Sequence, residues 1–163
     1  MDWRPHGLYG SPMAFPLPEP MRIALDEARQ AALTDEVPIG AVVTRDGAVV
    51  ARARNAMRTT SDPTAHAEVA ALREASRILG TSRLDDCDLW VTLEPCAMCA
   101  GAISLARIGR LYFAAADPKA GAVLHGPRLF GQPTCHHAPE VYAGIGEREA
   151  AEMLRAFFRE RRE

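Results

Sequence analysis

The sequence predicts a layered α/β domain built around a mixed β-sheet. Segments with helical periodicity alternate with short β-rich runs along the chain, an order typical of α/β architectures. The first two β-rich runs are separated by a tight turn, so they are expected to pair as an antiparallel hairpin and to make the sheet mixed. The length of 163 residues fits one domain of ordinary size.

The chain is expected to start with an irregular leader over residues 1–18. Four prolines and two glycines in this stretch are spaced so that neither a regular helix nor a central strand can form. From Glu19 the pattern becomes helical, and Pro20 suits the first turn of that helix. The apolar residues that recur at helical spacing are Met21, Ala24, Leu25, Ala28, Ala32 and Leu33. We therefore divide the chain into this leader and one domain over residues 19–163.

A hairpin is expected after the first helix. The β-rich runs 39–44 and 48–53 flank Asp46 and Gly47, and Asp-Gly is a strong hairpin signal because the tight turn needs positive φ. Helices and strands then alternate to the end of the chain. They are helix 65–79 closed by Gly80, strand 89–93, helix 96–106, strand 108–115 and helix 147–161.

Composition and charge narrow the class of protein. Hydrophobic residues make up 48% and charged residues 25%, as in globular domains. The chain has no apolar run of about 18 residues and no signal-peptide pattern at its start. We therefore expect a cytoplasmic protein that does not associate with a membrane. The formal net charge of -2 is not that of a polycation, so RNA contact would need a local basic patch. The four cysteines are expected to be thiols or metal ligands rather than disulfides.

Two short segments carry the residues of a catalytic metal site. His66 and Glu68 stand at the start of one predicted helix, and Cys96 and Cys99 stand where a strand passes into the next. Cysteines three apart at a helix start can direct both sulfurs to one point, and the helix N-terminus favours thiolate. Two thiolates and one imidazole suit Zn²⁺ and leave the fourth tetrahedral position open for water, as in catalytic sites. Glu68 is then placed to exchange protons with that water without being a ligand.

Each half of this pattern is weak on its own. A single Cys-x-x-Cys also occurs in redox motifs and in half of a zinc ribbon, and a His-x-Glu at a helix start is commonly surface or capping chemistry. A zinc ribbon would need a second Cys-x-x-Cys, which the chain lacks, and a redox motif does not predict the His-x-Glu. Both halves in this order, each at a helix start, favour a catalytic zinc site.

Residues 36–121 resemble the cytidine/deoxycytidylate deaminase superfamily, whose His-x-Glu and Pro-Cys-x-x-Cys signature they contain, and most closely the bacterial tRNA adenosine deaminases. The closer resemblance is carried by residues 35–42, 62–68, 91–102 and 117–122, and it continues through 157–159. Residues 124–141 depart from the best-known members. The resemblance implies a three-layer α/β/α cytidine-deaminase-like fold with a mixed, mostly five-stranded central sheet.

The resemblance also implies roles for individual residues. His66, Cys96 and Cys99 would hold one Zn²⁺ per subunit, and Glu68 would be the catalytic proton shuttle. The residues implied in substrate binding are Asn55, Val37, Pro38, Ala67 and Asp117. From the residues alone, Asn55 would be taken as a turn-former after a strand, and Asp117 as a loop opener.

The implied function is hydrolytic deamination of adenosine to inosine at the wobble position of the tRNA anticodon. The family is homodimeric, and the Ala-rich predicted helix 96–106 suits close packing between subunits. Contacts to RNA phosphates are expected from arginines of the terminal helix, which Phe157 and Phe158 would pack onto the domain, although a solvated helix end is an equal alternative. These arginines are Arg155, Arg159, Arg161 and Arg162.

Two other functions stay open at this point. A deaminase of a free nucleobase or nucleoside, of the guanine or cytosine type, would share the same zinc signature. A non-catalytic, zinc-stabilised RNA-binding module is the other, and both Glu68 and the open fourth position argue against it. The Cys135-His136-His137 segment invites a second metal site, but adjacent histidines tend to point apart, so we expect a loop without metal.

Overall fold

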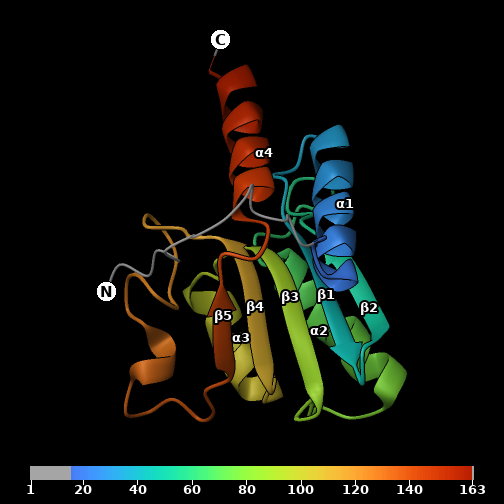
Figure 1. The fold of residues 1–163 in the computed structure, drawn as a ribbon, viewed down its shortest axis with the longest axis vertical. Helices are drawn as coiled ribbons and strands as arrows, with labels where there is room; N and C mark the ends of the chain where they lie inside the picture. Colours follow the sequence, from blue (N-terminus) through green and yellow to red (C-terminus); the bar gives the residue numbers. More distant parts are fainter. Residues whose placement is uncertain (1–15, 163) are drawn as a thin grey trace, which may run out of the picture.

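A five-stranded mixed sheet lies between two pairs of helices in the computed structural model, which describes residues 16–162 (Figure 1). The strands are β1 (Gly40–Arg45), β2 (Ala48–Arg54), β3 (Cys87–Leu93), β4 (Arg110–Ala115) and β5 (Glu140–Ala143). Their order across the sheet is β2-β1-β3-β4-β5. Strand β1 is antiparallel to both β2 and β3, whereas β3, β4 and β5 are parallel, so the mixed sheet is confirmed.

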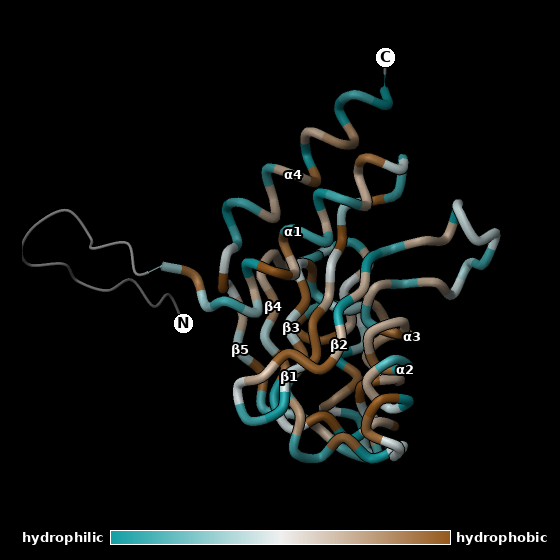
Figure 2. Tube along the Cα trace, turned by 90° about the vertical axis from the view of Figure 1, so that its right-hand side faces the viewer, coloured by the Kyte–Doolittle hydropathy of each residue, from teal (hydrophilic) through white to brown (hydrophobic). Residues whose placement is uncertain are grey.

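The helices cover both faces of the sheet. Helices α1 (Glu19–Leu33) and α4 (Glu147–Glu160) lie on one face, and α2 (Ala67–Leu79) and α3 (Ala97–Ala106) lie on the other. Seen from the side, the strands run between these two helix layers (Figure 2). A short 3-10 helix, η1 (Leu129–Gly131), packs near α3. The predicted three-layer α/β/α arrangement is therefore confirmed.

Local sequence signals account for the first elements. Asp46 and Gly47 have φ values of 51° and 78°, so the tight turn between β1 and β2 forms as the Asp-Gly pair predicts. Gly40 begins β1 directly beside α1, where a Cβ atom would lie 2.8 Å from the backbone nitrogen of Ala28. Only glycine therefore allows α1 to approach the sheet this closely.

Strand β5 is the element that the sequence analysis does not locate. It has four residues and is largely exposed, so it carries no alternating apolar pattern. Its position comes from parallel pairing with β4, where Glu140 lies opposite Arg110. Aromatic stacking supports the pairing, because Tyr142 stacks on Tyr112 with ring centroids 4.9 Å apart and Tyr112 stacks on Trp90 at 3.8 Å.

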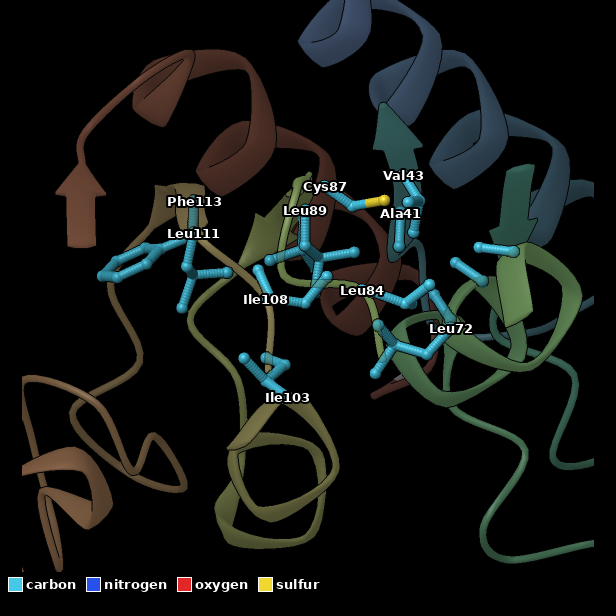
Figure 3. Packing of buried hydrophobic residues seen from close by; sticks show 14 of the residues in the cluster. Ala41, Val43, Leu72, Leu84, Cys87, Leu89, Ile103, Ile108, Leu111 and Phe113 are labelled. Atoms are coloured by element: carbon cyan, nitrogen blue, oxygen red, sulfur yellow. The ribbon is translucent and has the colours of Figure 1, made fainter. Parts of the chain in front are cut away.

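Apolar side chains fill the space on each side of the sheet. On the side of α2 and α3, Leu72 and Ile103 turn from the helices towards Leu89 and Leu111 of the sheet (Figure 3). On the other side, the buried cluster is formed by Met21, Ala24, Leu25, Val42, Trp90, Ala114, Ala115 and Ala150. Burying a side chain such as leucine contributes about 1.5–3 kcal/mol, so these two clusters hold the layers and the helix starts in place.

Three further expectations concern the leader, membrane-spanning helices and the cysteines. Residues 1–15 of the expected leader lie outside the described residues, and residues 16–18 precede α1 without regular structure. Within residues 16–162, no helix combines the length and the apolar character needed to span a membrane. None of the four cysteines, all within this range, forms a disulfide, as expected.

Candidate active site

Helices α2 and α3 begin next to each other, and their first turns bring the two signature segments together. His66 immediately precedes α2 with φ -80° and ψ 149°, and Cys96 immediately precedes α3 with φ -73° and ψ 176°. Both residues are extended because they occupy N-cap positions, where the chain turns into a helix. Cys99 follows one turn into α3, so its sulfur lies on the same side of the helix as that of Cys96.

The three predicted metal-binding side chains converge on one point. His66 Nδ1 lies 3.7 Å from Cys96 Sγ and 3.5 Å from Cys99 Sγ. All three potential ligand atoms lie within 4.8 Å of one another. Cys99 is buried while His66 and Cys96 are half-buried, so one side of the cluster is accessible. Two sulfurs and one imidazole nitrogen form a donor set that fits a tetrahedral divalent metal ion.

The two thiols have very different affinities for a proton. The hydrogen bond from the Cys99 thiol lowers the pKa of Cys96 to about 5 against the opposing effect of burial, and backbone N–H groups at the start of α3 and the nearby His66 contribute to this. The same shared hydrogen bond, together with burial, raises the pKa of Cys99. These surroundings favour the thiolate form of Cys96, the form in which cysteine binds metal.

Glu68 lies in the first turn of α2 and is buried beside this cluster. Its side chain is 4% exposed, and its Oε1 atom has no hydrogen-bond partner among the described residues. Burial raises the pKa of Glu68, and the neighbouring Cys96 raises it further. A buried carboxylate oxygen without a partner is costly. Such a group next to a cluster of metal-binding side chains is typical of a residue that exchanges protons there.

Asn55 joins the end of β2 to the start of α2. The residue is buried, and its Oδ1 accepts a hydrogen bond of 2.9 Å from the backbone N–H of Ala67, the first residue of α2. The side chain therefore satisfies an N–H group at the helix start from a distant segment. Because this contact fixes the amide oxygen, the Nδ2 group is the part of Asn55 that can donate elsewhere. Asn55 and Ala67, both predicted to bind substrate, are thus in direct contact.

The other predicted pocket residues come from two segments at one end of the sheet. Val37 and Asp117 line a groove of about 430 Å³, together with Leu93, Lys119 and residues of α4. Pro38, next to Val37, is buried. The Oδ1 atom of Asp117 accepts hydrogen bonds from the backbone N–H groups of Lys119 and Ala120, both 3.1 Å, so this side chain also shapes its own turn.

The arginines of α4 fall into two groups. Arg155, Arg159 and Arg162 are exposed and line a groove of about 540 Å³ with Leu154 and Phe158. Arg161 is engaged differently, because its guanidinium group pairs with the carboxylate of Asp35. The phenylalanines also differ: Phe157 is buried as predicted, but Phe158 is 46% exposed, so the expectation that both pack inward is wrong for Phe158. An exposed aromatic ring among arginines suits contact with a base or ribose.

The Cys135-His136-His137 segment is held against α3 and the loop after it. Cys135 Sγ lies 3.4 Å from Ser104 Oγ, and His137 Nε2 lies 2.8 Å from the carbonyl oxygen of Ile108. The backbone N–H of His137 donates to the same Ser104 hydroxyl at 3.1 Å. These contacts fasten the loop to the domain.

Two buried carboxylates at the site were given no role by the sequence analysis. Glu36 precedes Val37, and its Oε1 accepts from the backbone N–H and the hydroxyl of Thr59 at 2.7 and 2.8 Å. Glu94 precedes Pro95 and Cys96, and it binds the segment that contains Asp117. Burial opposes its ionisation, but hydrogen bonds from His125 and from backbone N–H groups outweigh this and lower the pKa of Glu94. An acidic residue directly after the apolar strand 89–93 is a signal that could have indicated a buried, paired charge.

Fold and site together define the class of the protein. A three-layer α/β/α fold in which one histidine, two cysteines and a buried glutamate meet at two helix starts is that of the cytidine/deoxycytidylate deaminase superfamily. A family model described as MafB19-like deaminase matches residues 18–162. The chain belongs to this family.

Individual relatives lie close in sequence and structure. The chain is 61% identical over 142 residues to a tRNA-specific adenosine deaminase of Agrobacterium fabrum, covering 87% of this chain and 93% of the relative. It is 45% identical to that of Bacillus subtilis, with coverages of 87% and 88%. A solved structure from work on A-to-I editing by tRNA:A34 deaminases at the wobble position is 60% identical, with a TM-score of 0.82 over 83% of this chain and 98% of that one. A guanine deaminase from Bacillus subtilis is 43% identical, with a TM-score of 0.58, over 60% and 62%.

Proposed function

We propose that this protein converts adenosine to inosine at the wobble position of a tRNA anticodon by hydrolytic deamination. The observation that carries the proposal is Glu68, a buried carboxylate with an unpartnered oxygen beside the converging His66, Cys96 and Cys99 side chains. Adenosine in tRNA is favoured as substrate by the relatives named tRNA-specific adenosine deaminase, which match the chain over nearly their whole length. With tRNA as its substrate, the protein is expected to act in the cytoplasm.

The metal that fits the proposed chemistry is Zn²⁺, one per subunit, held by His66, Cys96 and Cys99. When bound, zinc supplies Lewis acidity that activates water for attack on the purine carbon that carries the amino group. Glu68 accepts one proton from the attacking water and delivers it to N1 of the purine. It then takes the second proton, from the hydroxyl now attached to the purine carbon, and gives it to the departing amino group. The products are inosine and ammonia. Asn55 is held by Ala67 so that its Nδ2 group can donate to the nucleoside.

The substrate must leave its stack to enter such a site. An adenine in a single-stranded anticodon loop can be extruded more easily than one in a duplex. The exposed Arg155, Arg159 and Arg162 and the adjoining groove offer a local positive surface on a chain with a net charge of -2. We therefore assign the phosphate contacts of the anticodon stem-loop to this side of α4.

We also propose that the protein acts as a homodimer through α3. Leu105 is 68% exposed and Met98 38% exposed, which leaves apolar side chains of α3 uncovered in the single chain. A groove of about 340 Å³ beside Leu105, lined also by Gly101 and Leu129, allows a second chain to approach closely. Light scattering should give twice the chain mass, and Leu105→Glu should give a monomer. A wild-type protein that is monomeric at micromolar concentration would overturn this assignment.

The activity is tested with zinc-loaded protein and an anticodon stem-loop RNA that carries adenosine at the wobble position. Nucleoside mass spectrometry should detect inosine with wild-type protein and at least about a hundredfold less with Glu68→Gln. RNA binding without any product would instead identify a non-catalytic RNA-binding module.

A second function has its own supporting observation, the 43% identity to a guanine deaminase over part of the chain. Free guanine and free cytosine are therefore included as parallel substrates. Release of ammonia from one of these bases, with no inosine formed in the RNA, would favour the free-base deaminase and overturn the tRNA assignment.

A further inference from the structure

The buried carboxylate of Glu94 lies at the junction between β3 and the Cys96 segment, and the proposed chemistry does not use it. It follows directly on β3 and precedes Pro95, and its side chain has no exposed surface. We propose that Glu94 is a positioning residue that holds the segment 117–125 in the conformation that receives the substrate. This inference rests on the proposed function, because it concerns the same site.

Both oxygens of Glu94 accept hydrogen bonds from this segment. Oε2 accepts from the backbone N–H groups of Val123, Leu124 and His125 at 3.2, 3.0 and 3.1 Å. Oε1 accepts from the backbone N–H of Asp117 at 3.1 Å and pairs with His125 Nδ1 at 2.8 Å. One carboxylate therefore joins the two ends of a turn, and no strand or helix would otherwise satisfy these backbone groups.

The backbone at Gly121 packs tightly against this carboxylate. A Cβ atom at Gly121 would collide with Oε2 of Glu94 and with the carbonyl oxygen of Asp117, so the segment passes directly over the carboxylate. The next residue, Ala122, donates its backbone N–H to the carbonyl oxygen of Pro95 at 2.9 Å. The segment is thus tied to the two residues that immediately precede Cys96.

The segment held in this way supplies residues to the groove that contains Val37 and Asp117, two of the residues predicted to bind substrate. Asp117, Lys119 and Ala120 line the groove of about 430 Å³ together with Val37 and residues of α4. The turn that carries them is closed by Asp117 itself, whose backbone nitrogen is one of the atoms bound by Glu94. Glu94 therefore fixes the position of this side of the groove relative to the cluster of His66, Cys96 and Cys99. It does so without contacting the substrate.

The substitution Glu94→Gln tests this role. Glutamine keeps the volume but replaces one acceptor oxygen with an NH₂ donor, which faces backbone N–H donors and cannot bind them. With zinc-loaded protein and the anticodon stem-loop RNA, we expect KM to rise about tenfold while kcat stays within about threefold, because substrate placement is lost and the proton chemistry is kept. Zinc content should remain one per chain. Hydrogen exchange of the amides in 117–125 should become about tenfold faster.

Two companion variants sharpen the result. His125→Ala removes one donor whose side chain is partly exposed, so it should fold and shift KM and exchange in the same direction by less. Glu74→Gln, on the outer side of α2, makes the same chemical change away from the site and should alter neither quantity. If Glu94→Gln fails to fold, His125→Ala decides the question by the same two measurements.

The outcomes separate this proposal from the proposed function. Unchanged KM and unchanged exchange in 117–125, in a preparation whose wild type makes inosine, would overturn the role of Glu94. A fall in kcat at constant KM would overturn it as well, because that pattern belongs to a residue acting on the chemical step. Absence of inosine with wild type would overturn the proposed function instead, and the exchange measurement would still decide whether Glu94 orders the segment.

Discussion

Arg161, at the end of α4, is paired with Asp35, which lies 126 positions earlier in the chain. Its Nε donates to Oδ1 of Asp35 at 2.8 Å, and the guanidinium also lies 3.3 Å from the centre of the Phe157 ring. The hydrogen bond from Arg161 lowers the pKa of Asp35, and Arg58 contributes in the same sense. This contact fastens the end of α4 beside the segment that continues into Val37, so it positions the arginine-bearing helix at the groove that Val37 and Asp117 line.

The pairing with Asp35 predicts a structural role for Arg161. Arg161→Gln should lower Tm modestly and speed amide exchange at the end of α4, because the helix loses both its ion pair and its cation–π contact. It should leave the salt dependence of RNA binding unchanged. Calorimetry, hydrogen exchange and fluorescence anisotropy at several salt concentrations provide these three readings. A salt slope reduced by about one unit would assign Arg161 to a phosphate instead.

The exposed arginines of α4 should behave in the opposite way. Replacing Arg155, Arg159 and Arg162 with glutamine should weaken RNA binding and flatten its salt dependence by about one slope unit for each lost phosphate contact. The Tm should hardly change, because these side chains are exposed at the surface. A matched control replaces three exposed arginines elsewhere, Arg22, Arg73 and Arg77, and removes the same charge. Equal slopes for the two triple variants would place the RNA surface away from α4.

Metal binding should depend on Cys96 and be independent of Cys135. Cys96→Ala should reduce zinc from about one per chain to nearly none, since two remaining ligands cannot hold the ion tightly. Cys135→Ala should keep the metal, because Cys135 is engaged with Ser104. Elemental analysis of both variants after dialysis gives the answer. Removing the metal from wild-type protein with a chelator should also lower Tm, as loss of any ligand specific for the folded state does.

The sequence predicts those features that depend on local pattern and leaves out those that depend on contacts between distant segments. The alternation of elements, the Asp-Gly turn and the helix starts that carry His66 and Cys96 are local, and they are found as predicted. Strand β5 is short and exposed and is defined by pairing with β4, so no periodic signal marks it. Glu94 and Arg161 act through partners far along the chain, and a single sequence does not show which donors or acceptors will meet them.

Substitution of Glu68 should abolish most of the activity while leaving the stability of the fold unchanged or improved. Glu68→Gln should lower kcat by a factor of about 10²–10⁴, because the amide cannot carry protons between water and purine. Zinc content should be unaffected, since Glu68 is not among the convergent ligands. The metal-free variant should melt at the same temperature as metal-free wild type or above it, because a buried carboxyl with a raised pKa disfavours the folded state at neutral pH. More than about a tenth of wild-type turnover would exclude Glu68 as the proton carrier.

Asn55 offers a way to separate a structural contact from a substrate contact at one residue. Asn55→Ala removes the acceptor for the Ala67 N–H and should cost about 1 kcal/mol of stability, as loss of a helix N-cap does, as well as activity. Asn55→Asp keeps that acceptor but replaces the Nδ2 donor with an oxygen. Its Tm should therefore stay closer to wild type while inosine formation falls about as far as in Asn55→Ala. Thermal melts and single-turnover assays of both variants make the comparison. Near-normal inosine formation by Asn55→Asp would show that Asn55 serves the fold of α2 and does not bind the nucleoside.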